Sequence, residues 1–313
     1  MEIVQQALIF DTLPGRPSSH CATMTETADG SILAAWYSGT REGERDVAIM
    51  AARCEQSHWS TPTVLHDTLG LSDGNPLLCT LPDGTVVLWF VTIQGRGWSS
   101  ARPYWRRSHD GGHTWTSPER FSDRDGLMFR CRPLRLSSGR LVLPAYDEIT
   151  WEGLPLLSDD DGATWREAGR MIAPGPSGCI QPAILELDDG QLLAYLRTGH
   201  EADCIWESRS ADGGETWSPC TATNLPNPNA GIDLIRLVDG RLLLAYNPVP
   251  EGRYRLAVAI SDDAGATWDT TDLENEPGSE FSYPTLLQAR SGQCHLLYTY
   301  RRKCIKHVVI SPG

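Results

Sequence analysis

Side chains that can move protons or bind an anion occur at comparable places in several segments of this chain. One set stands just before apolar segments and contains His20, Gln181 and Tyr283. A second set follows such segments and contains Arg197. A histidine can abstract a proton, a tyrosine can donate one or act as a nucleophile, and an arginine can hold a carboxylate. The pattern predicts chemistry on an acidic group once a fold brings the two sets together.

These candidates are polar at positions where Val, Leu or Gly would pack best. Buried polar groups cost free energy unless they bind a ligand or one another. The first set comprises His20, Asn75, Arg132, Gln181, Asn229, Asp233 and Tyr283. The second set comprises Arg41, Asp46, Arg197, Asn247 and Arg301. We expect both sets at one mouth of a central channel, and the alternative for each residue is a satisfied side chain at the rim.

A repeated turn indicates which elements position these residues. The pattern S-x-D-x-G-x-T-W recurs with spacings of 50, 52 and 51 residues and starts at Ser108, Ser158, Ser210 and Ser261. A fixed period of this size is typical of repeat architectures. An active site does not need four equivalent copies, so we interpret four aspartates as turn residues: Asp110, Asp160, Asp212 and Asp263.

A second repeat predicts the fold. Hairpin turns of the form D-G or S-G, each followed by an apolar strand, place glycine at positions 30, 84, 139, 190, 240 and 292. Four strands in each of six units predict an all-β protein, a six-bladed β-propeller that forms a single domain over residues 1–313. The last unit lacks its fourth strand. We expect residues 3–10 to supply it, by pairing with the strand at residues 305–310.

Composition excludes several classes of function. The formal net charge of -13 disfavours nucleic acid and anionic membrane surfaces. No apolar run approaches the ~18 residues that would cross a membrane, and the N-terminus does not resemble a signal peptide. The nine cysteines include no C-x-x-C pair, which favours reduced thiols. We therefore expect a cytoplasmic protein with no metal site and no cofactor.

The repeated turns and the six-unit period resemble the Asp-box, or BNR-repeat, sialidase superfamily over essentially the whole chain. Four segments resemble more closely a sialidase-like BNR branch of bacteria and plants: residues 20–23, 39–43, 225–229 and 298–303. The resemblance implies an exo-acting glycoside hydrolase that removes a terminal acidic sugar from a glycan.

Matching the family motifs residue by residue assigns roles. Tyr283 matches the nucleophilic Tyr, Arg197 matches one Arg of the carboxylate-binding triad, and Asp46 matches the acid/base, with Glu42 and Glu44 as alternatives. Three positions depart from the family pattern. His20 stands in place of the first triad Arg, Gln181 replaces the Glu that activates the Tyr, and residues 229–233 contain no Arg. Arg132 or Arg301 is expected to restore part of the clamp.

The residues leave two alternatives to the glycosidase open, a polysaccharide lyase and a glycan-binding propeller. In a polysaccharide lyase, an arginine would neutralise a uronate, His20 would abstract the adjacent proton and Tyr283 would protonate the leaving oxygen. In a glycosidase, another carboxylate would have to accept the phenol proton in place of Gln181: Glu207, Asp233 or Glu280. The loss of two triad positions also fits a glycan-binding propeller without turnover.

Overall fold

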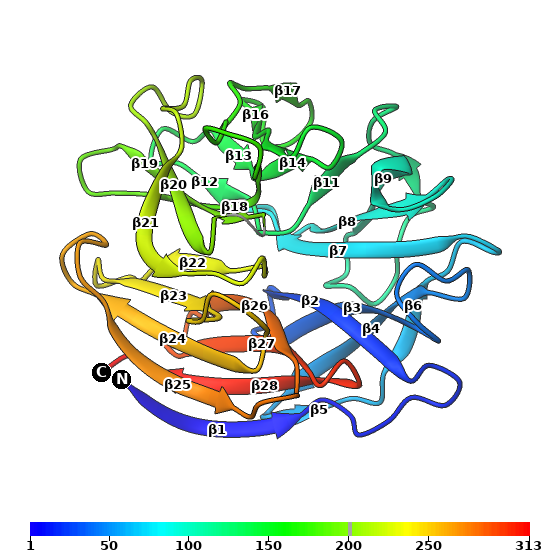
Figure 1. The fold of residues 1–313 in the computed structure, drawn as a ribbon. Helices are drawn as coiled ribbons and strands as arrows, with labels where there is room; N and C mark the ends of the chain where they lie inside the picture. The colour runs from blue at the N-terminus through cyan, green and yellow to red at the C-terminus, as the bar shows by residue number, and fades with distance from the viewer. Residues whose placement is uncertain (200–201) are drawn as a thin grey trace. The chain divides into compact units, whose positions relative to one another are not determined.

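The computed structural model describes residues 1–199 and 202–313, and nearly all of its regular structure is β-strand. The exception is the 3-10 helix η1, Trp98–Ser100. The chain divides into two compact units. The first unit is Met1–Phe129 together with Pro284–Gly313, and the second unit is Arg130–Tyr283. Each unit is built from antiparallel sheets (Figure 1), so the expected all-β class is confirmed.

The first unit contains three sheets, and in two of them the strand order follows the chain. One sheet has the order β2 (Ser18–Glu26), β3 (Ile32–Gly39), β4 (Ala48–Glu55) and β5 (His58–Trp59), with β6 (Thr63–His66) also on β4. The next has the order β7 (Ser72–Thr80), β8 (Val86–Ile93), β9 (Ala101–Ser108) and β10 (Glu119–Arg120). The short strand β11 spans Leu127–Phe129.

The third sheet of this unit joins the two ends of the chain. Its order is β26 (Phe281–Gln288), β27 (Cys294–Tyr300), β28 (Cys304–Ser311) and β1 (Glu2–Leu8), where β26 enters the unit at Pro284. Strand β1 pairs antiparallel with β28, from Glu2 opposite Ser311 to Leu8 opposite Lys306. Figure 1 shows the blue first strand beside the red last one. The expected N-terminal completion of the last sheet is confirmed.

The second unit repeats the same plan. One sheet has the order β12 (Leu134–Arg135), β13 (Leu141–Leu143), β16 (Leu156–Ser158) and β17 (Arg166–Glu167), and β14 (Ala145–Asp147) pairs with β15 (Glu152–Gly153). Another has the order β18 (Cys179–Glu186), β19 (Leu192–Thr198), β20 (Cys204–Ser210) and β21 (Thr221–Pro226). The last has the order β22 (Asp233–Arg236), β23 (Leu242–Tyr246), β24 (Arg255–Ser261) and β25 (Asp269–Asn275).

Glycine closes each hairpin between the first and second strands of a sheet. Its backbone N–H donates to the carbonyl three residues earlier, as in Gly30 to Thr27 and Gly190 to Leu187. All six predicted hairpin glycines have φ between 78° and 92°. A left-handed backbone at these positions favours glycine over any residue with a Cβ. The D-G and S-G signals therefore predicted the turns correctly.

The S-x-D-x-G-x-T-W turns form one repeated hydrogen-bond network. In the copy that starts at Ser261, Ser261 Oγ donates to Asp263 Oδ1 (2.8 Å) and accepts from Gly265 N (2.9 Å). The Thr267 hydroxyl and backbone N–H donate to the same carboxylate at 2.6 and 2.8 Å. These bonds lower the pKa of Asp263 to about 2, chiefly through the Thr267 hydroxyl. The four aspartates thus hold turns, as their repetition predicted.

Apolar side chains from neighbouring strands form a core within each unit. In the first unit, Trp36, Met50 and Leu297 belong to one buried cluster. In the second, Tyr195, Leu244 and Ile232 belong to another. Among the described residues, no helix has the length and apolar character that a membrane crossing requires.

Candidate functional site

A strained backbone position recurs near the start of the first strand in several sheets. The pairs β2–β3, β7–β8 and β18–β19 each shift register there. Cys21, Asn75 and Gln181, at or beside these shifts, have φ of 58°, 43° and 55°. Asn229 and Tyr283 have φ of 56° and 52°. A left-handed conformation costs a residue other than glycine about 1–3 kcal/mol and is concentrated at functional sites.

Three arginines surround Tyr283 within the second unit. Arg197 Nη1 donates to the Tyr283 hydroxyl oxygen at 2.5 Å. The guanidinium carbons of Arg130, Arg197 and Arg253 lie 5.4, 5.7 and 5.4 Å from the centre of the Tyr283 ring. Arg130 is 1% exposed, and Arg197 and Tyr283 are each 9% exposed. A guanidinium that donates to the phenol oxygen stabilises negative charge on that oxygen.

Asn229 connects two of these arginines. Its side-chain oxygen accepts from Arg197 Nε at 2.6 Å, and its backbone carbonyl accepts from Arg253 Nη2 at 2.7 Å. The left-handed backbone of Asn229 turns both oxygens toward the arginines. We call Arg130, Arg197, Arg253, Asn229 and Tyr283 the Tyr283 cluster. Its geometry suits a carboxylate, because planar guanidinium groups donate in pairs to that shape.

Glu280 contributes the acidic group next to the Tyr283 cluster. Its Oε1 accepts from Arg253 Nη1 at 3.3 Å and from Ser282 Oγ at 2.7 Å. Asn247 Nδ2 holds the same segment by donating to the carbonyls of Phe281 (2.8 Å) and Arg255 (2.6 Å). Asn247 therefore fixes the backbone that carries Tyr283.

Gln181 lies against the same cluster. Its Nε2 donates to the Tyr146 hydroxyl at 3.3 Å, and its Oε1 is buried without a hydrogen-bond partner among the described residues. A Cβ on Gly231 would lie 3.1 Å from Gln181 Oε1 and 3.3 Å from Cδ1 of Tyr283. Gly231 therefore keeps space open between the amide and the phenol ring. A ligand donor in that space would satisfy the amide oxygen.

The predicted acid/base loop lies in the first unit, after β3. Asp46 is exposed, and its carboxylate accepts from the Thr40 backbone N–H and hydroxyl, both at 2.9 Å. Arg41 Nη2 lies 2.6 Å from Glu44 Oε1. Glu42 Oε2 accepts from Arg302 Nη1 at 2.5 Å. Among the described residues, Asp46 has no arginine on its carboxylate, and its expected role as acid/base stays a prediction.

His20 and Asn75 are buried in the first unit. His20 Nδ1 lies 2.8 Å from Thr299 Oγ1, and the ring meets that of Tyr37 edge-on at 5.5 Å. Asn75 Nδ2 donates to the Phe129 carbonyl at 3.3 Å. Arg301 is exposed, with its guanidinium 5.1 Å from the Tyr300 ring. The roles of these three residues stay predictions.

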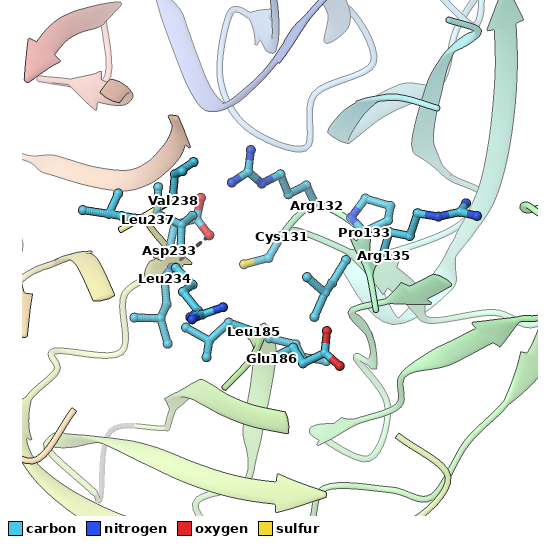
Figure 2. A pocket seen from close by; sticks show the side chains of 14 residues that line it. Cys131, Arg132, Pro133, Arg135, Leu185, Glu186, Asp233, Leu234, Leu237 and Val238 are labelled. Atoms are coloured by element: carbon cyan, nitrogen blue, oxygen red, sulfur yellow. Dashed lines mark hydrogen bonds between the residues drawn. The ribbon is translucent and has the colours of Figure 1, made fainter. Parts of the chain in front are cut away.

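Arg132 and Asp233 line a pocket of about 310 Å³ in the second unit. The pocket lies among β12, β18 and β22, and Figure 2 shows both side chains at it together with Cys131. Asp233 Oδ1 accepts from the Leu234 backbone N–H at 3.0 Å. The lining does not include Tyr283, and the expected roles of Arg132 and Asp233 stay predictions.

The expected sets contain neither Arg130 nor Arg253, although both contact Tyr283. Arg130 had a signal in the sequence: it stands nine residues before Gly139, as Gln181 does before Gly190 and Tyr283 before Gly292. The expected set names Arg132 instead, which stands seven residues before Gly139. Arg253 ends the long loop before β24, where no repeat defines the register.

The described residues contain no group of three or more His, Cys, Asp or Glu side chains arranged to hold a metal ion.

Comparison with known proteins gives the following matches. Residues 30–296, most of the chain, match the family described as BNR repeat-like domain. An anhydrosialidase of Macrobdella decora is 30% identical over 52% of this chain and 23% of its own length. A sialidase of Bacteroides fragilis is 25% identical over 67% of this chain and 44% of its own length. The chain therefore spans less than half of either relative.

Solved structures share the fold. A leech intramolecular trans-sialidase, complexed with 2,7-anhydro-Neu5Ac, superposes with a TM-score of 0.79 at 16% identity, over 98% of this chain and 70% of that one. Identity at this level carries information about the fold and not about the reaction.

Proposed function

The protein belongs to the BNR repeat-like domain family, and from that premise we propose that it is an exo-acting glycoside hydrolase of the sialidase type. Its substrate is a glycan that ends in an acidic sugar. We also propose that the sheets of the two units are the blades of one six-bladed β-propeller, a single domain over residues 1–313. The names of the relatives, sialidase and anhydrosialidase, support the reaction class.

The contact between Arg197 and Tyr283 carries the proposal. A phenol that accepts a 2.5 Å bond from a guanidinium, with two more guanidinium groups beside its ring, is suited to a nucleophile that works next to a carboxylate. In this proposal Arg130 and Arg253 supply the two guanidinium groups that the family motif has and that His20 and residues 229–233 lack. The clamp then consists of Arg130, Arg197 and Arg253.

In the proposed reaction, the clamp binds the sugar carboxylate and the Tyr283 oxygen attacks the anomeric carbon. Asp46 protonates the leaving oxygen and later activates the water that releases the sugar. Gln181 cannot accept the phenol proton, so in this proposal Glu280, the carboxylate next to the Tyr283 cluster, accepts it and returns it when the Tyr283 oxygen leaves the sugar. Arg197 supplies part of the missing function, because its hydrogen bond stabilises the negative charge that develops on the phenol oxygen.

Turnover of a substrate panel tests the proposal. The panel contains 3'-sialyllactose, a 4-methylumbelliferyl sialoside and 4-methylumbelliferyl uronides, and released sugar is measured by chromatography. We expect release from at least one acidic substrate. Tyr283→Phe should reduce turnover below detection while the thermal unfolding midpoint stays close to that of the unaltered protein. Tyr104→Phe, on β9, serves as the matched control. Full activity in Tyr283→Phe would remove the nucleophile from the proposal.

One observation favours a second candidate, a lyase acting on uronates. His20 is a buried histidine with Nδ1 near a hydroxyl, an arrangement that orients a ring as a base. Elimination forms a conjugated double bond that absorbs ultraviolet light, whereas hydrolysis does not. The same panel, followed by absorbance with oligouronates, therefore separates the two reactions. Binding without either product would indicate a glycan-binding protein.

A further inference from the structure

Two buried cysteines meet in the second unit. Cys179 begins β18, and Cys220 stands directly before β21. Their sulfur atoms lie 3.4 Å apart, and the two residues are 0% and 1% exposed. Both belong to a buried cluster that includes Met171 and Leu196. Because β18 and β21 are the first and last strands of one sheet, the contact joins the first strand to the segment that leads into the last.

Neighbouring backbone groups hold both cysteines in place. The backbone N–H of Cys179 donates to the Trp151 carbonyl at 2.8 Å, and that of Cys220 donates to the Ile172 carbonyl at 3.0 Å. The Met171 carbonyl accepts from the Cys179 thiol at 3.5 Å. A single staggered torsion places each sulfur once the backbone is fixed. The two anchored backbones therefore keep the sulfur atoms in contact.

The contact makes the two thiols unequal. In the neutral pair the Cys179 thiol donates to the Met171 carbonyl, so Cys220 is the donor between the sulfurs. The hydrogen bond from Cys220 lowers the pKa of Cys179 against the opposing effect of burial, and the same contact raises the pKa of Cys220. The thiolate is the reactive form of cysteine. Cys179 is therefore the thiol that reacts first, with Cys220 positioned to react with its product.

We propose that Cys179 and Cys220 form a site of reversible oxidation, at which hydrogen peroxide converts the two thiols into a disulfide. The Cys179 sulfur attacks one peroxide oxygen and becomes a sulfenic acid as the O–O bond breaks. The hydroxide that leaves takes up the proton that Cys179 lost. The Cys220 sulfur then attacks the Cys179 sulfur, the S–O bond breaks, and the second hydroxide leaves with the Cys220 proton. Two thiols thus lose two electrons, and one peroxide becomes two water molecules.

The surroundings suit the oxidised state. The sulfur atoms of a disulfide are about 2.05 Å apart, so a short approach of two atoms already in contact forms the bond. A disulfide has no charge and no hydrogen-bond donor, and it remains compatible with apolar neighbours such as Leu196. The two cysteines are 41 residues apart in the chain. A cross-link over such a span limits the conformations of the unfolded chain, so oxidation should stabilise the fold.

Peptide mapping of the unaltered protein tests the inference. The protein is reduced with dithiothreitol, desalted, treated with hydrogen peroxide in its folded state and freed of peroxide with catalase. It is then alkylated in denaturant and digested with trypsin without a reductant. Cys179 is the single cysteine of the tryptic fragment 171–197, and Cys220 is the single cysteine of the fragment 210–236. We expect these two fragments to be cross-linked, and dithiothreitol should separate them.

Calorimetry measures the effect on stability. The unfolding midpoint of the oxidised protein should lie about 5 °C above that of the reduced protein. Cys220→Ala should remove both the cross-link and the shift. Cys179→Ala should do the same, so a folding defect in one variant does not end the test. Cys54→Ala is the control, because Cys54 is also buried but lies on β4 in the first unit, and its loss should leave the cross-link and the shift unchanged.

Fragments 171–197 and 210–236 that carry no cross-link after peroxide treatment would overturn the inference. A cross-linked fragment 171–197 in Cys220→Ala, or equal midpoints for the oxidised and reduced proteins, would overturn it as well. The inference goes beyond the proposed function, and none of these measurements uses a glycan. Turnover of the substrate panel is a separate experiment, so each of the two ideas can fail while the other stands.

Discussion

Guanidinium groups that lie close together repel one another, and the Tyr283 cluster keeps three of them beside a single phenol, Arg130 and Arg197 buried and Arg253 half-buried. Asn229 accepts hydrogen bonds from two, and Glu280 provides one negative charge. Buried charges of one sign are costly unless they are paired or hydrogen-bonded. In the proposed function, a bound carboxylate would add to this compensation.

At the residue scale, Arg253→Met tests the membership of Arg253 in the clamp. The change removes a positive charge from the Tyr283 ring and one partner of Glu280. Hydrogen bonds to charged groups contribute roughly 1.5–3 kcal/mol, so kcat/KM should fall about 10- to 100-fold on the substrate that the panel identifies.

The control for this variant is Arg255→Met, two residues away, where the guanidinium Nε contacts Asp272 at 2.9 Å and both side chains are about a third exposed. Exposed ion pairs contribute about 0–1 kcal/mol, and this variant should retain its activity. Equal losses in the two variants would show that Arg253 has no special role.

Some residues of the Tyr283 cluster were predictable at this scale and others were not. Tyr283 and Arg197 follow from motif positions, and Asn229 follows from its place before an inner strand. The predicted set contains Arg132 and omits Arg130, which stands nine residues before its hairpin glycine. Arg253 reaches the cluster from a loop, and loop conformation depends on tertiary contacts that a repeat period does not encode.

At the element scale, the S-x-D-x-G-x-T-W turn is a local structure, which explains why the sequence predicts it so well. Its hydrogen bonds lie within eight residues, and the same four partners recur in each copy. The first repeat shows the limit of this rule. There Gln56 and Ser57 adopt φ of 48° and 67° between β4 and β5, so a two-residue hairpin replaces the longer turn.

Asp212→Ala tests the contribution of one such turn. The carboxylate of Asp212 accepts from the Thr216 backbone N–H at 3.0 Å and from the Thr216 and Ser210 hydroxyls at 2.5 and 2.8 Å. Loss of this network should cost about 1 kcal/mol and lower the unfolding midpoint by roughly 2 °C in calorimetry. Asp262→Ala, at an exposed position in another copy of the turn, should leave the midpoint unchanged. Equal midpoints for the two variants would contradict the structural role.

At the scale of the whole molecule, the pairing of β1 with β28 satisfies an edge that β28 would otherwise expose. An open edge offers unpaired N–H and C=O groups to other chains. The sequence predicted this pairing, since the last repeat is one strand short. The hairpin turns of the repeats also predicted the antiparallel sheets of both units.

Buried histidines make the stability of the first unit depend on pH. His295 Nδ1 lies 2.9 Å from His307 Nε2, and Trp59 Nε1 donates to the other nitrogen of His307 at 3.2 Å. The pair needs one donor and one acceptor, so neutral rings fit it. Burial lowers the pKa of His307 to about 3 and that of His66 to about 4, and it also lowers the pKa of His295.

The unfolded chain protonates these histidines below about pH 6.5, whereas the folded chain does not. Stability should therefore fall as the pH decreases from about 6.5 toward 4, by about 1.4 kcal/mol per pH unit for each histidine that stays neutral. Asp73 opposes part of this fall, because burial raises its pKa to about 6 and the folded state gains a proton first.

Urea unfolding at pH 7.5, 6.5 and 5.5 measures the effect. His307→Gln should flatten the dependence, and His58→Gln, at an exposed position, should leave it as it is. A stability that does not change between pH 7.5 and 5.5 would contradict the linkage.

Five residues share a left-handed backbone conformation but carry side chains of different chemistry: Cys21, Asn75, Gln181, Asn229 and Tyr283. The surrounding strands offset the free-energy cost of the left-handed conformation, whichever side chain the residue carries. Substituting the side chain at one of these positions should therefore alter its reactivity while the fold is retained. Libraries confined to these five codons would vary the chemistry at these positions on an unchanged fold.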